Sequence, residues 1–184
     1  MSPDISFDTS INPYRGCEHG CVYCFARPTH AWLGLSPDLD FERRLFAKEN
    51  AAELLKQELA AKGYGPKLIA IGTNPDPYQP IERRLRIMRD ILEVLRDSRH
   101  PVIIKTKSDA VLRDIDILQD MAAEHLVPVT ISVTTLDKSM ARTMEPRAAS
   151  PYRRIAAIRK CADTNISIAV NVAPGIPGLT DYEL

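Results

Sequence analysis

The sequence predicts an α/β protein built on a parallel β-sheet, and three observations support this prediction. Short apolar runs typical of buried strands alternate with amphipathic helical patterns, and they begin about 25 to 40 residues apart, as repeated βαβ units require. Polar loops rich in proline or glycine follow the ends of these runs. Three of the four cysteines lie within residues 17–24, after a first extended segment. Since parallel strands end at one edge of a sheet, these loops are expected to converge there.

The individual elements follow from periodicity and from breaker residues. After an extended segment at residues 5–14, strands are expected at residues 67–72, 102–106, 127–133 and 166–172. Helices are expected at residues 47–61, 81–99, 111–121 and 152–162. Residues 28–40 are expected to be irregular, and three prolines make residues 73–80 a rigid polar loop that cannot be helical.

Composition limits the class of protein. With 184 residues, 45% of them hydrophobic, the chain is long enough for one domain with a substantial core. The 24 basic and 24 acidic residues balance, so no overall field indicates a nucleic-acid partner. Two basic clusters fall on predicted helices, where solvated faces are expected. They comprise Arg83, Arg84, Arg86 and Arg89, and Arg153, Arg154, Arg159 and Lys160.

The cysteine loop indicates a metal cluster. Cys17, Cys21 and Cys24 have the spacing C-x3-C-x2-C, which lets one tight loop turn three thiolates toward one centre, and Gly16 and Gly20 supply backbone freedom. A structural zinc site is closed by four ligands, whereas a four-iron cubane held by three cysteines keeps one iron open. The sequence therefore favours an iron–sulfur cluster.

The cysteines also admit other interpretations. A zinc site that adds His19 to the three cysteines uses suitable residue types, but His19 lies between the ligands in a short loop and would strain the chelate. Cys161 has no nearby partner, so it is expected to be core or surface filler rather than a fourth ligand. Trp32 and Leu33 are expected to pack over the cluster or into the core.

The loop resembles that of the radical S-adenosylmethionine (radical SAM) enzymes, whose signature is this cysteine spacing with an aromatic residue, here Tyr23, before the third cysteine. Residues 12–21 resemble the branch related to the DNA repair enzyme spore photoproduct lyase. The resemblance implies a [4Fe-4S] cluster on Cys17, Cys21 and Cys24 whose open iron chelates S-adenosylmethionine. One electron, from a reductant such as flavodoxin or ferredoxin, then yields methionine and a 5′-deoxyadenosyl radical. The resemblance to this branch also implies lyase-like activity. The sequence does not identify the substrate, and nucleic acid is a candidate.

The resemblance also implies that the parallel sheet is a partial (β/α) TIM-like barrel. It further implies that the loops of this barrel contact the cofactor. Thr73, Asn74 and Asp76 stand where the family receives the S-adenosylmethionine ammonium, although the usual Gly-Gly-Glu-like motif is absent. Lys107 matches a Thr-Lys pair that would neutralise the methionine carboxylate. Without the resemblance, residues 73–80 are only a rigid turn and Lys107 only a solvated lysine.

Three further contacts come from later loops. Ser132 and Thr134 point to one side of a strand and would bond the ribose or the methionine end of the cofactor. Glu145 and Arg147 resemble a Glu-x-Arg motif suited to ribose hydroxyls and carboxylate, and they are otherwise a local surface pair. The last contact is a Gly-rich strip for adenine in which Gly175 contributes backbone groups and Ile176 an apolar face. It is otherwise an ordinary loop.

The chain end and the cellular location complete the predictions. Residues 180–183 form a capping-box pattern, yet the sequence stops at Leu184, so we expect residues 1–184 to be a radical SAM core domain truncated after its fifth strand. The N-terminus does not resemble a signal peptide, no apolar run is long enough to span a membrane, and reduced thiolates indicate the cytoplasm. The alternatives from other classes are a non-catalytic iron–sulfur electron carrier or redox sensor, and a zinc-stabilised binding module.

Overall fold

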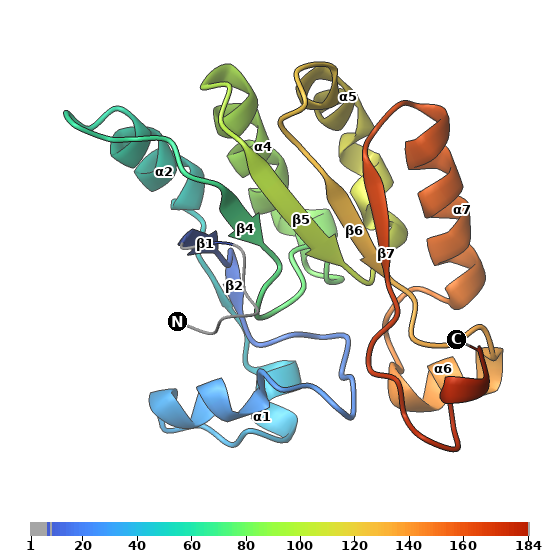
Figure 1. The fold of residues 1–184 in the computed structure, drawn as a ribbon. Helices are drawn as coiled ribbons and strands as arrows, with labels where there is room; N and C mark the ends of the chain where they lie inside the picture. The colour runs from blue at the N-terminus through green and yellow to red at the C-terminus, as the bar shows by residue number, and fades with distance from the viewer. Residues whose placement is uncertain (1–6, 8, 184) are drawn as a thin grey trace.

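A parallel sheet forms the centre of the computed structural model, which describes residues 7 and 9–183 (Figure 1). Five strands lie in the spatial order β1-β4-β5-β6-β7, and each neighbouring pair is parallel. They are β1 (Thr9–Ile11), β4 (Ile69–Ile71), β5 (Val102–Thr106), β6 (Val129–Ser132) and β7 (Ile168–Asn171). The predicted α/β class and parallel sheet are confirmed, and β5 has the predicted bounds.

The two faces of the sheet differ in chemistry because side chains alternate along each strand. One face is apolar at matched positions of neighbouring strands, for example Ile104, Val129 and Ile168. The opposite face, which we call the inner face, carries polar or small side chains toward its carboxyl end, for example Lys105 beside Thr130, whereas Ile103 lies on the same face nearer the strand start. A parallel sheet covered on both sides is usually apolar on both faces. The polar inner face therefore indicates that this side of the sheet lines a binding cavity.

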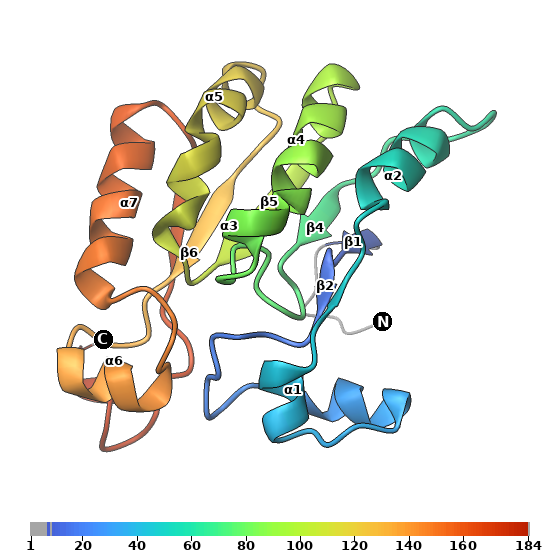
Figure 2. The ribbon, with the colours of Figure 1, turned by 180° about the vertical axis from the view of Figure 1, so that it is seen from behind.

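Helices cover the apolar face, as the view from behind shows (Figure 2). They are α2 (Ala51–Leu59), α4 (Ile87–Asp97), α5 (Ile115–Ala123) and α7 (Pro151–Asp163). Ile91, Leu92 and Leu95 of α4 are fully buried in this core. Cys161 of α7 is buried with them, which confirms its prediction as core filler. Within the described residues, no helix combines the length and apolarity needed to cross a membrane.

Three elements depart from the predicted helices in detail. The helix expected at residues 81–99 is divided into α3 (Glu82–Leu85) and α4, because Arg86 has a left-handed backbone with φ 55°. A 3₁₀ helix, η2 (Asp109–Asp114), precedes α5. The helix α6 (Lys138–Met144) was not predicted; it begins at Asp137, whose side chain accepts a hydrogen bond from the Met140 N–H at 2.7 Å.

The region below the sheet in Figure 1 is more ordered than predicted. Its elements are β2 (Tyr14–Arg15) paired antiparallel with β3 (Phe46–Ala47), and the helices η1 (Arg27–Leu33) and α1 (Leu39–Arg43). The expectation of irregular structure at residues 28–40 is therefore wrong. Trp32 was expected to be packed, yet it is 82% exposed. In η1 the buried side chain is His30, which packs edge-on against Phe41 of α1.

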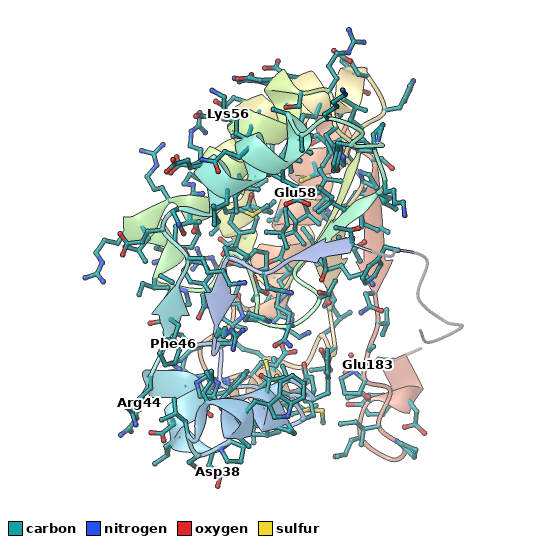
Figure 3. All side chains as sticks on the ribbon, turned by 90° about the vertical axis from the view of Figure 1, so that its left-hand side faces the viewer. Asp38, Arg44, Phe46, Lys56, Glu58 and Glu183 are labelled. Carbon is teal, nitrogen blue, oxygen red and sulfur yellow. The ribbon has the colours of Figure 1, made fainter. Side chains whose placement is uncertain are left out.

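The last described element is a short 3₁₀ turn, η3 (Asp181–Glu183). Glu183 does not complete the expected capping box; its carboxylate accepts hydrogen bonds from Thr135 Oγ1 at 2.7 Å and from the Leu136 N–H at 2.6 Å. In the side view, Glu183 and Arg44 lie at the end of the molecule opposite Lys56 of α2 (Figure 3). The segments that follow β7 and the segments around α1 therefore lie at the same end of the molecule.

A buried ionic cluster joins the helices behind the sheet. Glu82 and Asp114 are both buried, and Arg113 donates to each of them, at 2.7 and 2.6 Å. Asp114 also accepts from Tyr78 Oη at 3.1 Å and from Arg89 at 3.2 Å. The expectation that the cluster Arg83 to Arg89 is a purely solvated face is therefore wrong for Arg89.

Asp114 and Asp116 both bond Arg89, but Asp114 is buried and Asp116 is exposed. Asp114 should therefore contribute far more to the stability of the protein. Asp114→Ala leaves the buried Tyr78 hydroxyl without its acceptor and removes one of the two carboxylates that Arg113 bonds, and breaking a buried pair on one side typically costs about 3 to 5 kcal/mol of unfolding free energy. Asp116→Ala is the matched control, because Asp116 also bonds Arg89 but is exposed, and surface pairs contribute about 0 to 1 kcal/mol. Urea unfolding measures both. Equal losses in the two variants would contradict the role assigned to the buried cluster.

Candidate active site

A pocket of about 500 Å³ opens at the carboxyl-terminal edge of the sheet. It contains all three cysteines of the predicted cluster loop together with residues from the ends of β4, β5, β6 and β7. The predicted site residues that line it are Cys17, Cys21, Cys24, Tyr23, Thr73, Asn74, Asp76, Lys107 and Ser132. Chain segments far apart in sequence thus meet at one edge, as parallel strands require.

The cysteine loop is fixed by its backbone. The Cys17 N–H donates to the carbonyl of Phe41 at 2.9 Å, which ties the loop to α1. Gly16 has φ +81°, and a side chain there would collide with the same Phe41 carbonyl, so glycine is required both for the turn and for this close approach. Cys17 and Cys21 are buried, and Cys24 is half-buried.

The chemistry of these thiols fits a cluster. Burial raises the pKa of Cys21 to about 12 and raises that of Cys17 further, so the bare thiols stay protonated at neutral pH. Thiolate binding to a metal offsets this cost by placing positive charge beside the sulfur. Among residues 7 and 9–183, no three Cys, His, Asp or Glu side chains are grouped as a ready site for a metal ion. The three thiols nevertheless line one pocket, and His19 lines it with them.

Asp76 joins the loop after β4 to the end of β5. Its carboxylate accepts hydrogen bonds from Thr106 Oγ1 at 2.7 Å, from the Lys107 N–H at 2.6 Å and from the Tyr78 N–H at 2.9 Å. His19 Nδ1 lies 3.5 Å from the same carboxylate without a hydrogen bond, and burial lowers the His19 pKa. Asp76 thus holds the pocket wall together, which adds an architectural role to its predicted place beside the cofactor ammonium.

Thr73, Asn74 and Lys107, the other predicted cofactor contacts in this part of the pocket, are positioned by different interactions. Asn12, just after β1, accepts from the Asn74 N–H at 3.1 Å and donates to Thr73 Oγ1 at 3.4 Å. The Lys107 ammonium lies 5.8 Å from the centre of the Tyr23 ring, within range of a cation–π interaction. Lys107 is half-buried and, within the described part of the chain, has no carboxylate within salt-bridge distance. It is therefore available to an anionic ligand.

Glu145 and Arg147 do not pair with each other, which makes their interpretation as a local surface pair wrong. Glu145 is buried and bonds Tyr23 Oη, Thr134 Oγ1 and Arg154. Burial alone would raise the pKa of Glu145, but Arg154 and these hydrogen bonds hold it below its usual value, so the carboxylate is ionised. Arg147 is largely exposed and pairs with Glu42 of α1.

Several predicted residues lie outside the pocket lining. Thr134 is buried, and Gly175 and Ile176 belong to a loop in which the Ile176 N–H donates to Thr180 Oγ1 at 2.8 Å. Thr134 Oγ1 also lies 3.2 Å from the carbonyl of Ala173, which places this loop beside the end of β6. The roles assigned to these residues stay predictions.

The pocket also contains residues to which the sequence prediction assigned no cofactor contact. They are Phe7, His19, Phe25, Gly72, Lys105, Thr106 and Asn171. Strand alternation is the signal for two of them, because Lys105 stands two residues before Lys107, and Asn171 pairs with Ser132 on the inner face. Gly72 has φ +85°, and a side chain there would strike the Lys105 carbonyl, so β4 ends in close contact with β5.

Comparison with known proteins identifies the family of the chain. Residues 11–184 match the model of the Radical SAM superfamily, and the chain therefore belongs to that superfamily. An uncharacterized protein of Mycobacterium bovis, Mb2609c, is 37% identical over 177 residues, covering 96% of this chain and 52% of that protein. The uncharacterized protein MJ0683 of Methanocaldococcus jannaschii is 31% identical over 173 residues, covering 94% of this chain and 62% of that protein. The chain thus spans about half to three-fifths of these relatives.

Solved structures share the fold at low sequence identity. Spore photoproduct lyase complexed with dinucleoside spore photoproduct superposes with a TM-score of 0.67 at 17% identity, covering 95% of this chain and 50% of that one. Streptococcus suis SuiB bound to S-adenosylmethionine gives a TM-score of 0.61 at 17% identity, covering 90% and 32%. The expected radical SAM core, with its partial barrel, is confirmed as a fold.

Proposed function

We propose that this chain is the catalytic core of a radical SAM enzyme. The observation that supports the proposal is the sharing of one pocket by the three cysteines and the polar ends of four parallel strands. A bound [4Fe-4S] cluster with S-adenosylmethionine supplies reductive cleavage of the sulfonium, chemistry that belongs to the cofactor. The protein's part is to hold the cluster on Cys17, Cys21 and Cys24 and to orient S-adenosylmethionine beside it.

The pocket residues suggest how the chain orients S-adenosylmethionine. Lys107 neutralises the methionine carboxylate, because its ammonium faces the pocket and has no acidic partner among the described residues. Thr73 and Asn74 offer oxygens to the ammonium of the methionine end, and Asp76 adds negative charge behind them. Ser132 offers a hydroxyl at the end of β6 for the ribose. A non-catalytic electron carrier needs none of these groups, so the polar pocket favours the enzyme.

The cluster ligands can be tested by metal content. Anaerobically reconstituted protein should be brown with about four irons per chain, and Cys17→Ala, Cys21→Ala or Cys24→Ala should remove most of the iron. Cys161→Ala is the matched control, because that thiol is fully buried in the helical core and should leave the iron content unchanged. Zinc in the purified protein, or an equal loss of iron from the control, would contradict the assignment.

Cofactor binding can be tested by spectroscopy and by product. S-adenosylmethionine should change the electron paramagnetic resonance signal of the reduced cluster, and slow formation of 5′-deoxyadenosine should follow with dithionite. Lys107→Ala removes a charged hydrogen-bond donor, a loss of about 1.5 to 3 kcal/mol, so its binding should weaken roughly ten- to hundredfold. Lys62→Ala, at an exposed lysine beyond α2, is the control. An unchanged signal and no 5′-deoxyadenosine from the intact protein would favour the electron carrier.

We further propose that the substrate lies against the inner face and is a nucleic acid. Lys105 and Asn171 support this, since both are exposed, both line the pocket, and Lys105 has no carboxylate within salt-bridge distance in the described part of the chain. An exposed cation suits a phosphodiester, and an amide suits a base edge. The structural neighbour complexed with dinucleoside spore photoproduct is a precedent for such a substrate on this fold.

The substrate proposal has its own assay. Single-stranded or duplex DNA should raise the rate of 5′-deoxyadenosine formation by the intact protein, and the increase should fall as salt rises. Lys105→Met should remove most of the increase while leaving the DNA-independent rate unchanged, and Lys105→Arg, which keeps the charge, should restore it. A rate that DNA does not alter would exclude this class of substrate while leaving the radical SAM assignment intact.

Two partner and location predictions accompany this function. A one-electron reductant such as flavodoxin or ferredoxin is required by the proposed chemistry. A cytoplasmic location stays a prediction that rests on the need to keep the three thiols reduced.

A further inference from the structure

We infer that Arg154 and Glu145 are positioning residues for the cysteine loop and act on it through Tyr23. Sequence reasoning placed Arg154 on a solvated helix face, but the side chain is only 1% exposed. Its Nε donates to the Ala149 carbonyl at 2.8 Å, and its Nη1 donates to the Ser132 carbonyl at 2.9 Å. Arg154 is therefore anchored at the carboxyl end of β6, directly beside the pocket.

The guanidinium holds Glu145 in a single orientation. Arg154 Nη2 donates to Oε2 of the carboxylate, while Oε1 accepts from Thr134 Oγ1 at 2.8 Å and from Tyr23 Oη. Both carboxylate oxygens are thus engaged by protein groups in a site that is 3% exposed. A carboxylate satisfied in this way is suited to orient a neighbour rather than to receive a ligand. Glu145 therefore holds Tyr23, and the ribose contact that its motif predicts stays a prediction.

Tyr23 carries this constraint into the cysteine loop, because it lies between the second and third cluster ligands in sequence. Two backbone hydrogen bonds act in parallel. The Val22 N–H donates to the Met144 carbonyl at 2.9 Å, and the Arg147 N–H donates to the His19 carbonyl at 3.2 Å. Residues 144–147, which we call the anchor segment, therefore hold the loop by these two backbone contacts and by two side chains, Glu145 on Tyr23 and Arg147, whose Nε donates to the Glu18 carbonyl. The sequence separation of 122 residues between Tyr23 and Glu145 makes this a tertiary constraint on the loop.

Positioning matters here because three thiolates must keep their mutual geometry to hold three irons of a cluster while the fourth iron stays open. Loose ligands lose metal, and residues that fix ligand orientation typically change metal affinity ten- to a hundredfold. The inference rests on the proposed function for its consequence, but the mechanical link itself exists in the protein without a cluster. The two can therefore be tested separately.

Amide hydrogen exchange of the intact protein without cluster tests the link. The Val22 and Arg147 amides report directly on the contacts between loop and anchor segment. Tyr23→Phe, which removes one hydroxyl, should raise their exchange rates roughly tenfold or more, and Arg154→Met should do the same. Arg153→Met is the matched control, because this adjacent arginine is exposed and pairs with Asp109 rather than with Glu145; it should leave the rates unchanged.

The reference for global effects is the Ile104 N–H, which donates to the Pro128 carbonyl within the sheet. Its exchange should stay unchanged in Tyr23→Phe. Adding Tyr23→Phe to Arg154→Met should raise loop exchange by less than in the wild-type background, because both changes break one chain of contacts. Arg154→Lys should recover part of the protection by keeping the charge on Glu145.

Iron release supplies a second readout. In reconstituted protein, both variants should lose iron to a chelator roughly ten- to hundredfold faster than wild type, and Arg153→Met should not. Unchanged exchange at Val22 and Arg147 in Tyr23→Phe would overturn the inference, as would an equal rise at Ile104 in both variants. Faster loop exchange in a protein that binds no iron would uphold the positioning link and reject the proposed function.

Discussion

The parallel direction of five strands is the constraint on which the rest of the structure depends. Because every strand ends at the same edge, side chains that follow Ile11, Ile71, Thr106 and Ser132 meet there although long segments separate them in sequence. Alternation along the same strands gives one face to the helical core and leaves the other polar. The pocket therefore follows from strand direction and alternation together, and the cysteine loop completes it from the β1 end.

Sequence periodicity predicted the parts of the fold whose stability comes from regular burial. The strand Val102–Thr106 and the helix Pro151–Asp163 were placed within one residue at each end, because apolar spacing and a Ser-Pro start are local signals. The helices η1, α1 and α6 were missed because each is short and has few apolar residues in register. Contacts remote in sequence support them, such as the pairing of Arg27 with Glu42.

The residues of the candidate site also fall into two groups, those with a local sequence signal and those that only the tertiary structure identifies. The cysteines were found from spacing alone, and Lys107 from its resemblance to a family motif, because both signals lie within a few residues. Lys105 and Asn171 needed the strand register, which decides the face that each side chain takes. Arg154 was misread because its helix pattern is amphipathic overall, and only the tertiary structure brings Glu145 to its guanidinium. Burial of a charge is visible in sequence only when its partner is local.

The two buried ionic clusters serve different parts of the molecule. Asp114 and Glu82 lie behind the sheet and join helices, whereas Glu145 and Arg154 lie at its carboxyl edge and reach the cysteine loop. Desolvation largely cancels the attraction within such pairs, so their net contribution to stability is small, although losing one partner is costly. The contribution of these clusters is to orientation. Each carboxylate accepts hydrogen bonds from several fixed donors, and this fixes the arrangement of the side chains around it. At the edge of the sheet, that arrangement includes the orientation of Tyr23 between two cluster ligands.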